Sequence, residues 1–305
     1  MPSLKEIKGR IASVKSTLKI TSAMKLVASA KLRKAQQAIE GMRPYERKLQ
    51  EMLAHLTRQA GGSGVGISGT YARIGSRSDA EESATTGPET LAEEKVVIVA
   101  FASNSSLCGA FNANAVRLAL ETIQSCGDAQ VTVYSVGRKM AEAMKKVGYP
   151  SPADFHDLAD KPSYAEAAAL AGQLMEDFHE GRIDRVELVY NHFVSSGKQV
   201  PVRETFLPST IVIPSEAKES ETDYILEPSA KELLEELLPK SLKLKLYTAL
   251  LDSNASEHAA RTVAMQTATD NGEDLLQELT LQYNKSRQQK ITSEILDLAG
   301  GSQQQ

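Results

Sequence analysis

Hydrophobic positions along the first 60 residues form one long, narrow seam. Steps of three and four residues in alternation, starting at the first leucine, reach an apolar side chain at thirteen of sixteen positions. The sixteen positions are Leu4, Ile7, Ile11, Val14, Leu18, Thr21, Lys25, Ala28, Leu32, Ala35, Ile39, Met42, Glu46, Leu49, Leu53 and Leu56. Such a seam is typical of a coiled coil, whereas an ordinary surface helix carries a wider apolar stripe.

A second long helix is predicted towards the C-terminus. Residues 240–298 contain no proline and a single glycine, Gly272. At 1.5 Å per residue an unbroken helix of this length spans about 90 Å, which no compact domain of this size encloses. The two long helices therefore bracket a smaller central unit, and their natural partner is each other, in antiparallel orientation.

Local signals mark where these helices begin and where they are interrupted. Residues 3–6 (SLKE) and 229–232 (SAKE) fit capping boxes, in which a hydroxyl and a carboxylate satisfy free amides at a helix start. Pro44 predicts a kink or a break in the first helix. Pro239 is expected to end a short helix or to bend it.

Between the long helices the pattern changes to alternating strands and helices. Strands are predicted at residues 95–101, 131–136, 185–195 and 199–206, and helices at 110–124, 138–147 and 164–179. This alternation indicates a parallel sheet covered by helices, with antiparallel pairing of the last two strands as an option. The predicted fold class is α/β: a long antiparallel coiled coil of the N- and C-terminal helices plus a central doubly wound, Rossmann-like α/β domain.

Four regions follow from these patterns. Residues 1–60 form the N-terminal coiled-coil helix, 61–94 a flexible insert and 95–214 the α/β domain. Residues 215–305 form a loop, named the foot loop here, and the C-terminal coiled-coil helix. The insert holds seven glycines and five serines among its 34 residues. Because few large apolar side chains are present to offset the entropy of ordering the backbone, the insert is predicted to be mobile.

The α/β domain lacks the common signatures of a nucleotide enzyme. After the first strand, residues 102–112 (ASNSSLCGAFN) contain one glycine and neither the G-x-G-x-x-G nor the P-loop pattern. Cys108 and Cys126 form no C-x-x-C pair, which favours free thiols in a reducing compartment, with Cys108 in a structural turn. His192 and His258 show no metal-ligand spacing. We therefore predict no catalytic, cofactor-binding or metal-ligating residue.

Charge is distributed unevenly along the chain. Residues 1–36 carry nine basic side chains and one acid, a net charge of +8, whereas the whole chain has −4 and the remainder therefore −12. This pattern fits a solvated flank of a coiled coil. It also fits a basic amphipathic coiled-coil protein that binds an anionic membrane or nucleic acid, although the seam already engages the apolar face and the chain is net acidic. A third hypothesis is an enzyme built on the α/β domain.

The C-terminal helix contains a polar interruption at residues 284–290 (NKSRQQK). These seven consecutive residues include no apolar side chain, so they visit every heptad position and make two turns polar on all sides. Such a stretch weakens a free coiled coil. It is understandable if another protein surrounds the helix there and supplies hydrogen bonds.

Four stretches together resemble the γ subunits of rotary (F-type) ATP synthases. They are residues 20–36 (ITSAMKLVASAKLRKAQ), 106–112 (SLCGAFN), 190–195 (YNHFVS) and 256–295 (SEHAARTVAMQTATDNGEDLLQELTLQYNKSRQQKITSEI). They occur in the family's order and span nearly the full chain. The insert at 61–94 and residues 103–109 (SNSSLCG) depart from the family's pattern.

The resemblance implies a central rotor stalk without catalytic residues of its own. In this family the coiled coil threads a ring of α and β subunits, and the α/β domain binds the ε subunit and the membrane c-ring. Proton flow turns the c-ring and the stalk, and the stalk drives the β subunits through the conformations that form ATP. No cofactor, nucleic acid or directly bound nucleotide is implied.

Site residues follow from the same resemblance. Contacts with the β subunits, which present an acidic loop to the basic helix, are implied at Met24, Lys25, Arg261, Gln288 and Thr292. Contacts with the c-ring are implied at Tyr224 and Glu227. The longest apolar run, residues 96–102, falls far short of the roughly 20 residues of a membrane span. With no signal or transit peptide evident, we expect a peripheral protein on the cytoplasmic side of the bacterial inner membrane.

Overall fold

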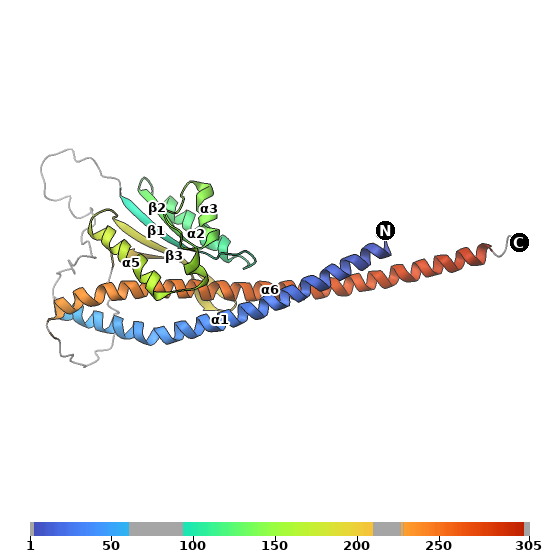
Figure 1. Cartoon of the computed structure of the whole chain (residues 1–305), viewed down its shortest axis with the longest axis horizontal. Coiled ribbons are helices and arrows are strands. Elements are labelled where there is room, and N and C mark those ends of the chain that lie inside the picture. The colour runs from blue at the N-terminus through green and yellow to red at the C-terminus, as the bar shows by residue number, and fades with distance from the viewer. Residues whose placement is uncertain (1–2, 61–93, 210–226, 228, 302–305) are drawn as a thin grey trace. The chain divides into compact units, whose positions relative to one another are not determined.

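The computed structural model describes residues 3–60, 94–209, 227 and 229–301 of the chain (Figure 1). Tyr224 and the predicted insert, apart from Glu94, lie outside the described residues. The chain divides into two compact units. The helix unit comprises Met1–Ala30 and Arg261–Gln305, and the sheet unit comprises Lys31–Ala260.

Two long helices, α1 (Leu4–Ala60) and α6 (Ala230–Gly301), contribute to both units. Both begin where the capping signals predict. The backbone amides of Glu6 and Glu232 donate to the hydroxyls of Ser3 and Ser229, at 3.2 and 3.3 Å. Each bond satisfies one amide that has no partner inside its helix.

The two prolines do not end these helices. Pro44 lies inside α1 and Pro239 lies inside α6, so the predicted break at Pro44 and the predicted helix end at Pro239 are wrong. A proline removes one helical donor and crowds the preceding turn. In these helices buried apolar side chains lie on both sides of each proline, and this packing outweighs the local cost.

The predicted seam of α1 is confirmed, since all sixteen of its positions are buried or partly buried. In the sheet unit the seam packs against α6 in two clusters. The first contains Leu32, Ala35, Ile39, Leu251, Ala255 and Ala259, and the second contains Leu49, Leu53, Leu56, Leu234 and Leu244. Because the contacts move backwards along α6 as they move forwards along α1, the two helices are antiparallel there.

The helix unit contains its own pairing of α1 with α6. The hydroxyls of Thr21 and Thr269 are hydrogen bonded at 3.0 Å, so this polar position of the seam finds its partner on the opposite helix. One turn away, a Cβ atom added to Gly272 would lie 2.7 Å from Leu18 Cδ2. Gly272 therefore marks the place where the Leu18 side chain of α1 packs directly on the backbone of α6.

The sheet unit is built around a four-stranded sheet with the order β2-β1-β3-β4. Its strands are β1 (Lys95–Phe101), β2 (Gln130–Val136), β3 (Arg185–Ser195) and β4 (Lys198–Leu207). Strand β1 is parallel to β2 and to β3, and β3 and β4 form an antiparallel hairpin. Each predicted strand lies within one residue of the observed bounds, and the optional antiparallel pairing is confirmed.

Helices cover both faces of this sheet, which confirms the doubly wound α/β class (Figure 1). They are α2 (Phe111–Ser125), α3 (Arg138–Val147), α4 (His156–Asp160) and α5 (Tyr164–His179). Helices α2 and α3 pack on one face, and α5 and part of α6 pack on the other. Helix α4 was not predicted, because a helix of five residues carries too little periodicity to be recognised.

Candidate functional site

The carboxyl ends of the parallel strands are where a doubly wound sheet usually holds a ligand. In this protein the polar side chains at this edge, Ser103, Asn104 and Asn112, form hydrogen bonds with other groups of the chain. The backbone amide and hydroxyl of Ser103 both approach Asn112 Oδ1 at 3.0 Å, and Asn112 Nδ2 donates to Cys108 Sγ at 3.2 Å. Asn104 accepts from the amide of Arg138 and donates to the carbonyl of His156. Cys108 is buried in this turn, so its side chain serves packing.

The residues implied as β-subunit contacts belong to the helix unit. Met24 and Lys25 are partly buried, whereas Gln288 and Thr292 are exposed. The structure brings the last two together, because the Thr292 hydroxyl donates to the carbonyl of Gln288 at 2.9 Å. Arg261 differs from the others: it is only 8% exposed and has an interaction within the chain.

Exposed apolar side chains surround these positions on both helices of the unit. They are Ile20, Leu26 and Val27 on α1, and Val263, Leu275, Leu281, Ile291, Ile295 and Leu296 on α6. The predicted polar stretch 284–290 is exposed apart from the partly buried Ser286. Eight of the nine basic residues near the N-terminus are also exposed, with Lys25 as the exception.

Glu227, implied as a c-ring contact, is exposed. Tyr224, its predicted companion, lies outside the described residues. Among the described residues, no group of three or more histidine, cysteine, aspartate or glutamate side chains is placed to hold a metal ion.

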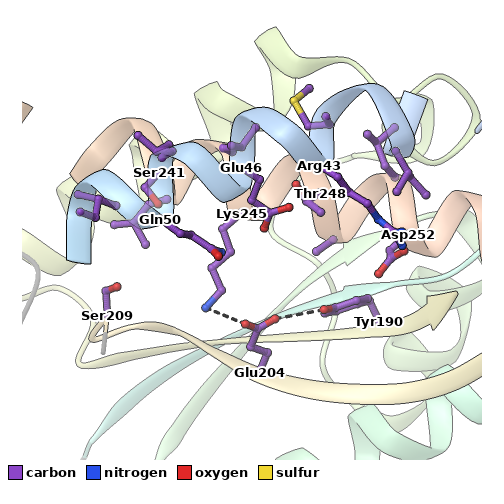
Figure 2. Close-up of a pocket in the computed structure, with 18 of the residues that line it drawn as sticks. Arg43, Glu46, Gln50, Tyr190, Glu204, Ser209, Ser241, Lys245, Thr248 and Asp252 are labelled. Carbon is purple, nitrogen blue, oxygen red and sulfur yellow. Dashed lines mark hydrogen bonds and ion pairs between the residues drawn. The ribbon is translucent and has the colours of Figure 1, made fainter. Parts of the chain in front are cut away.

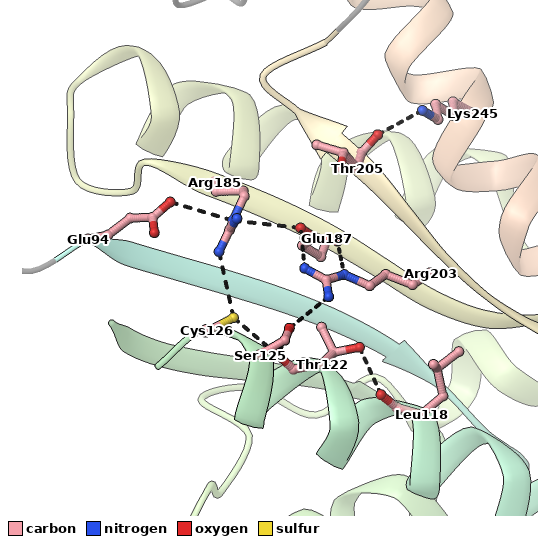
Figure 3. Close-up of polar contacts among 10 residues, drawn as sticks. All are labelled: Glu94, Leu118, Thr122, Ser125, Cys126, Arg185, Glu187, Arg203, Thr205 and Lys245. Carbon is pink, nitrogen blue, oxygen red and sulfur yellow. Dashed lines mark hydrogen bonds and ion pairs between the residues drawn. The ribbon is translucent and has the colours of Figure 1, made fainter. Parts of the chain in front are cut away.

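A buried ion pair, which the sequence pattern did not predict, joins strands β3 and β4 (Figure 3). The Glu187 side chain is 3% exposed, and both of its oxygens accept from Arg203, at 2.8 and 3.1 Å. Arg203 also donates to Ser125 Oγ at 2.7 Å and thereby reaches the end of α2. The hydrogen bonds to Glu187 raise the pKa of the Arg203 guanidinium. A glutamate between valine and leucine on the strand predicted at residues 185–195 was the available signal for this pair.

A second polar cluster lines a cavity of about 530 Å³ in the sheet unit, between α1, α6 and the β3–β4 hairpin (Figure 2). Glu204 accepts from the Tyr190 hydroxyl at 3.1 Å and pairs with Lys245 at 3.0 Å. Burial, and then the charge of Glu204, raise the pKa of the Tyr190 hydroxyl. His192 Nδ1 is hydrogen bonded to Asp252, whose pKa is raised by burial and lowered in part by that bond.

The spacing of His192 predicted no metal site, and the sequence pattern did not predict the other members of this cluster. Its members come from four elements, and the pair His192–Asp252 is separated by 60 positions. One signal was present: Glu46 is an acid within the hydrophobic seam of α1, and it is one of the residues that line the cavity.

These features define a class of protein. Two long helices flank a small doubly wound domain whose described polar groups at the strand ends are bonded internally, and the helices expose apolar and basic surface. This is the arrangement of an interaction subunit within a larger assembly. No described helix has the length and apolar character that a membrane span requires.

Comparison with known proteins identifies the family. A family model described as ATP synthase matches residues 3–303. The ATP synthase gamma chain of Phocaeicola vulgatus is 53% identical over 309 aligned positions, covering 99% of both chains, and that of Flavobacterium johnsoniae is 41% identical over 303, again covering 99% of both. The chain belongs to the ATP synthase gamma chain family.

Solved structures share the fold at lower identity. A chain in the Euglena gracilis mitochondrial ATP synthase structure, OSCP/F1/c-ring, superposes with a TM-score of 0.61 at 21% identity, covering 97% of this chain and 92% of that one. A chain in the Tetrahymena thermophila mitochondrial ATP synthase structure, central stalk/c-ring, gives 0.52 at 22% identity, covering 82% and 99%. These matches confirm the predicted architecture of two long helices and a central α/β domain.

Proposed function

We propose that this chain is the central rotor stalk of a proton-driven ATP synthase, coupling rotation of a membrane c-ring to conformational change in the catalytic β subunits. The observation that carries the proposal is the match to gamma chains over 99% of both sequences. The exposed apolar and basic surface of the helix unit supports it. The chain is a non-catalytic subunit in this proposal, and ATP forms on the β subunits.

The proposed partners are the α and β subunits around the helix unit, and the ε subunit and the c-ring at the sheet unit. An exposed ion pair contributes only about 0–1 kcal/mol and is weakened by salt. Attraction between the exposed basic residues of α1 and an acidic surface is therefore weak at each position. A contact between a rotating stalk and the surrounding subunits requires such weak attraction, since the stalk is then not held tightly at any single rotation angle.

The proposed β-subunit contacts are Met24, Lys25, Arg261, Gln288 and Thr292. Gln288 is the most accessible of them, and its amide can both donate and accept. Hydrogen bonds to a charged group are worth about 1.5–3 kcal/mol, which biases one rotor angle and still breaks in each turn. For Arg261 the low exposure leaves only a small part of the side chain within reach of a partner.

A rotation assay tests the proposed function. The chain is assembled with the α and β subunits of its own organism, and a bead is attached at Lys198→Cys, an exposed position next to the β3–β4 turn, in a Cys126→Ser background. ATP is expected to drive rotation of the bead in one direction. Gln288→Leu is expected to slow rotation about tenfold by removing one charge-assisted bond, whereas Gln124→Leu on the surface of α2 leaves the rate unchanged. ATP hydrolysis without any rotation of the bead contradicts the proposal.

Tyr224 and Glu227 are the proposed c-ring contacts. Glu227→Lys reverses the charge of an exposed side chain. Proton-driven ATP synthesis in the membrane-bound enzyme is expected to fall severalfold, while ATP hydrolysis by the detached head stays normal. Glu235→Lys, an exposed glutamate on α6, is the matched control. If Glu227→Lys lowers ATP synthesis and ATP hydrolysis equally, Glu227 is not a c-ring contact.

The proposed location is the cytoplasmic side of the bacterial inner membrane, with the chain attached peripherally through its partners. The relatives from Phocaeicola vulgatus and Flavobacterium johnsoniae support a bacterial setting.

A further inference from the structure

One stretch of α6, residues 252–259 (DSNASEHA), is buried although six of its eight side chains are polar. It holds no large apolar side chain, and its apolar packing on α1 comes from Ala255 and Ala259. The part of α6 before it differs, because it packs on the sheet through large side chains such as Leu242 and Leu246. The position of residues 252–259 therefore depends on polar contacts.

Two of these polar side chains bond to strand β3. Asp252 is hydrogen bonded to His192 Nδ1, and the Ser256 hydroxyl donates to the main-chain carbonyl of Asn191 at 2.8 Å. Asn191 lies beyond the part of β3 that pairs with β1, and the residue opposite it on β4 is Pro201, which has no N–H to donate. The fully buried Ser256 therefore supplies this carbonyl with a donor that the sheet does not.

A third polar side chain bonds on the other side of the helix. Asn254 Nδ2 donates at 2.9 Å to the carbonyl of Ala159. Ala159 is next to last in α4, and the last carbonyls of a helix have no donor within it. At about 3.6 residues per turn, Asp252 and Ser256 lie on one face of α6 and Asn254 lies about 180° away from them. The helix is therefore bonded from two opposite sides, by β3 and by α4.

We propose that Asp252, Asn254 and Ser256 form a clamp that fixes the rotation of α6 about its own axis within the sheet unit. Apolar contacts have no direction, whereas a hydrogen bond weakens steeply when its angle changes. Turning α6 in either direction would break bonds on both faces and leave buried polar groups without partners, which costs more than an average hydrogen bond contributes. In a rotor stalk the clamp transmits torque from the sheet unit to α6, and this consequence rests on the proposed function.

The distance between two spin labels on the purified full-length chain tests the clamp. The labels are attached at Lys198→Cys, exposed beside the hairpin turn, and at Ala260→Cys, partly buried just after the clamp, in a Cys126→Ser background. Pulsed electron paramagnetic resonance is expected to give one narrow distance distribution for this parent chain. Asn254→Leu combined with Ser256→Ala is expected to broaden the distribution about twofold or more, because two of the three bonds of the clamp are lost.

Thr267→Ala is the matched control for the label experiment. It removes a hydroxyl of α6 that bonds within its own helix, to the carbonyl of Val263 at 3.1 Å, so the parent distribution is expected. Circular dichroism shows whether each variant is folded. If the double variant is not folded, Ser256→Ala alone decides, with a smaller broadening expected. An unchanged distribution in the folded clamp variant, or equal broadening in Thr267→Ala, overturns the proposal.

A rotation assay of the assembled complex separates the clamp from the rotor function. With a bead at Lys198→Cys, the angle of the bead during pauses is expected to spread about twofold more in the folded clamp variant, while ATP hydrolysis without a bead keeps the parent rate. A parent complex that hydrolyses ATP without rotating the bead contradicts the proposed function, and the label experiment then decides the clamp. Rotation with the parent's angular spread in the clamp variant shows that the clamp does not transmit torque.

Discussion

Replacing Gly137 with alanine is expected to lower the free energy of unfolding by about 3 kcal/mol or more. Gly137 joins β2 to α3 with φ of +99°, a conformation that side chains strain. A Cβ atom there would also lie 2.1 Å from the carbonyl oxygen of Ala102, which is backbone at the end of the central strand and cannot move aside. The shift in the unfolding midpoint, measured by circular dichroism, is expected to be about 6 °C or more.

Gly148→Ala is a control for the positive φ of Gly137. Gly148 has φ of +97° and lies in the left-handed region with ψ of 10°, whereas Gly137 has ψ of 141°, and a Cβ atom at Gly148 meets nothing within 4 Å. The control therefore measures the cost of a left-handed alanine without a clash, about 1–2 kcal/mol. If both variants lose the same stability, the prediction of a larger loss at Gly137 is wrong.

Replacing Arg203 with methionine is expected to destabilise the sheet unit by about 3 kcal/mol. The Glu187 carboxylate is 3% exposed and would lose both of its hydrogen bonds from Arg203. Arg185 stays near, at 3.6 Å, but is too distant to replace them (Figure 3). The loss is expected to arise mainly from Glu187, because its buried carboxylate would keep only the longer ion pair with Arg185 and no hydrogen bond from Arg203.

A double variant separates these two contributions. Glu187→Leu combined with Arg203→Met removes both charges and is expected to be more stable than Arg203→Met alone. Lys139→Met breaks an exposed pair with Glu142 at 2.8 Å and is expected to cost less than about 0.5 kcal/mol. Chemical denaturation of the four proteins provides the comparison. A double variant less stable than Arg203→Met contradicts the interpretation of Glu187 as the source of the loss.

The sequence by itself determined which segments form helices and strands, and the α/β class of the fold. Periodicity is a property of neighbouring residues, so the seam of α1 and the apolar runs of the strands could be read directly. The capping serines act over three residues and were equally visible. The β-subunit contacts were inferred from resemblance alone and stay predictions; of these residues, Gln288 and Thr292 are exposed.

The tertiary structure alone decided which polar residues meet. Glu187 and Arg203 are 16 positions apart and His192 and Asp252 are 60 apart, so only the hairpin register and the packing of α6 on the sheet bring them together. Burial likewise comes from packing between elements. Burial of apolar side chains on both sides of Pro44 and Pro239 keeps the two helices continuous at these prolines. The packing of α1, α6 and the hairpin also places Glu46 of the seam in the lining of a cavity. These outcomes depend on the free energy of contacts between distant segments, which no local pattern contains.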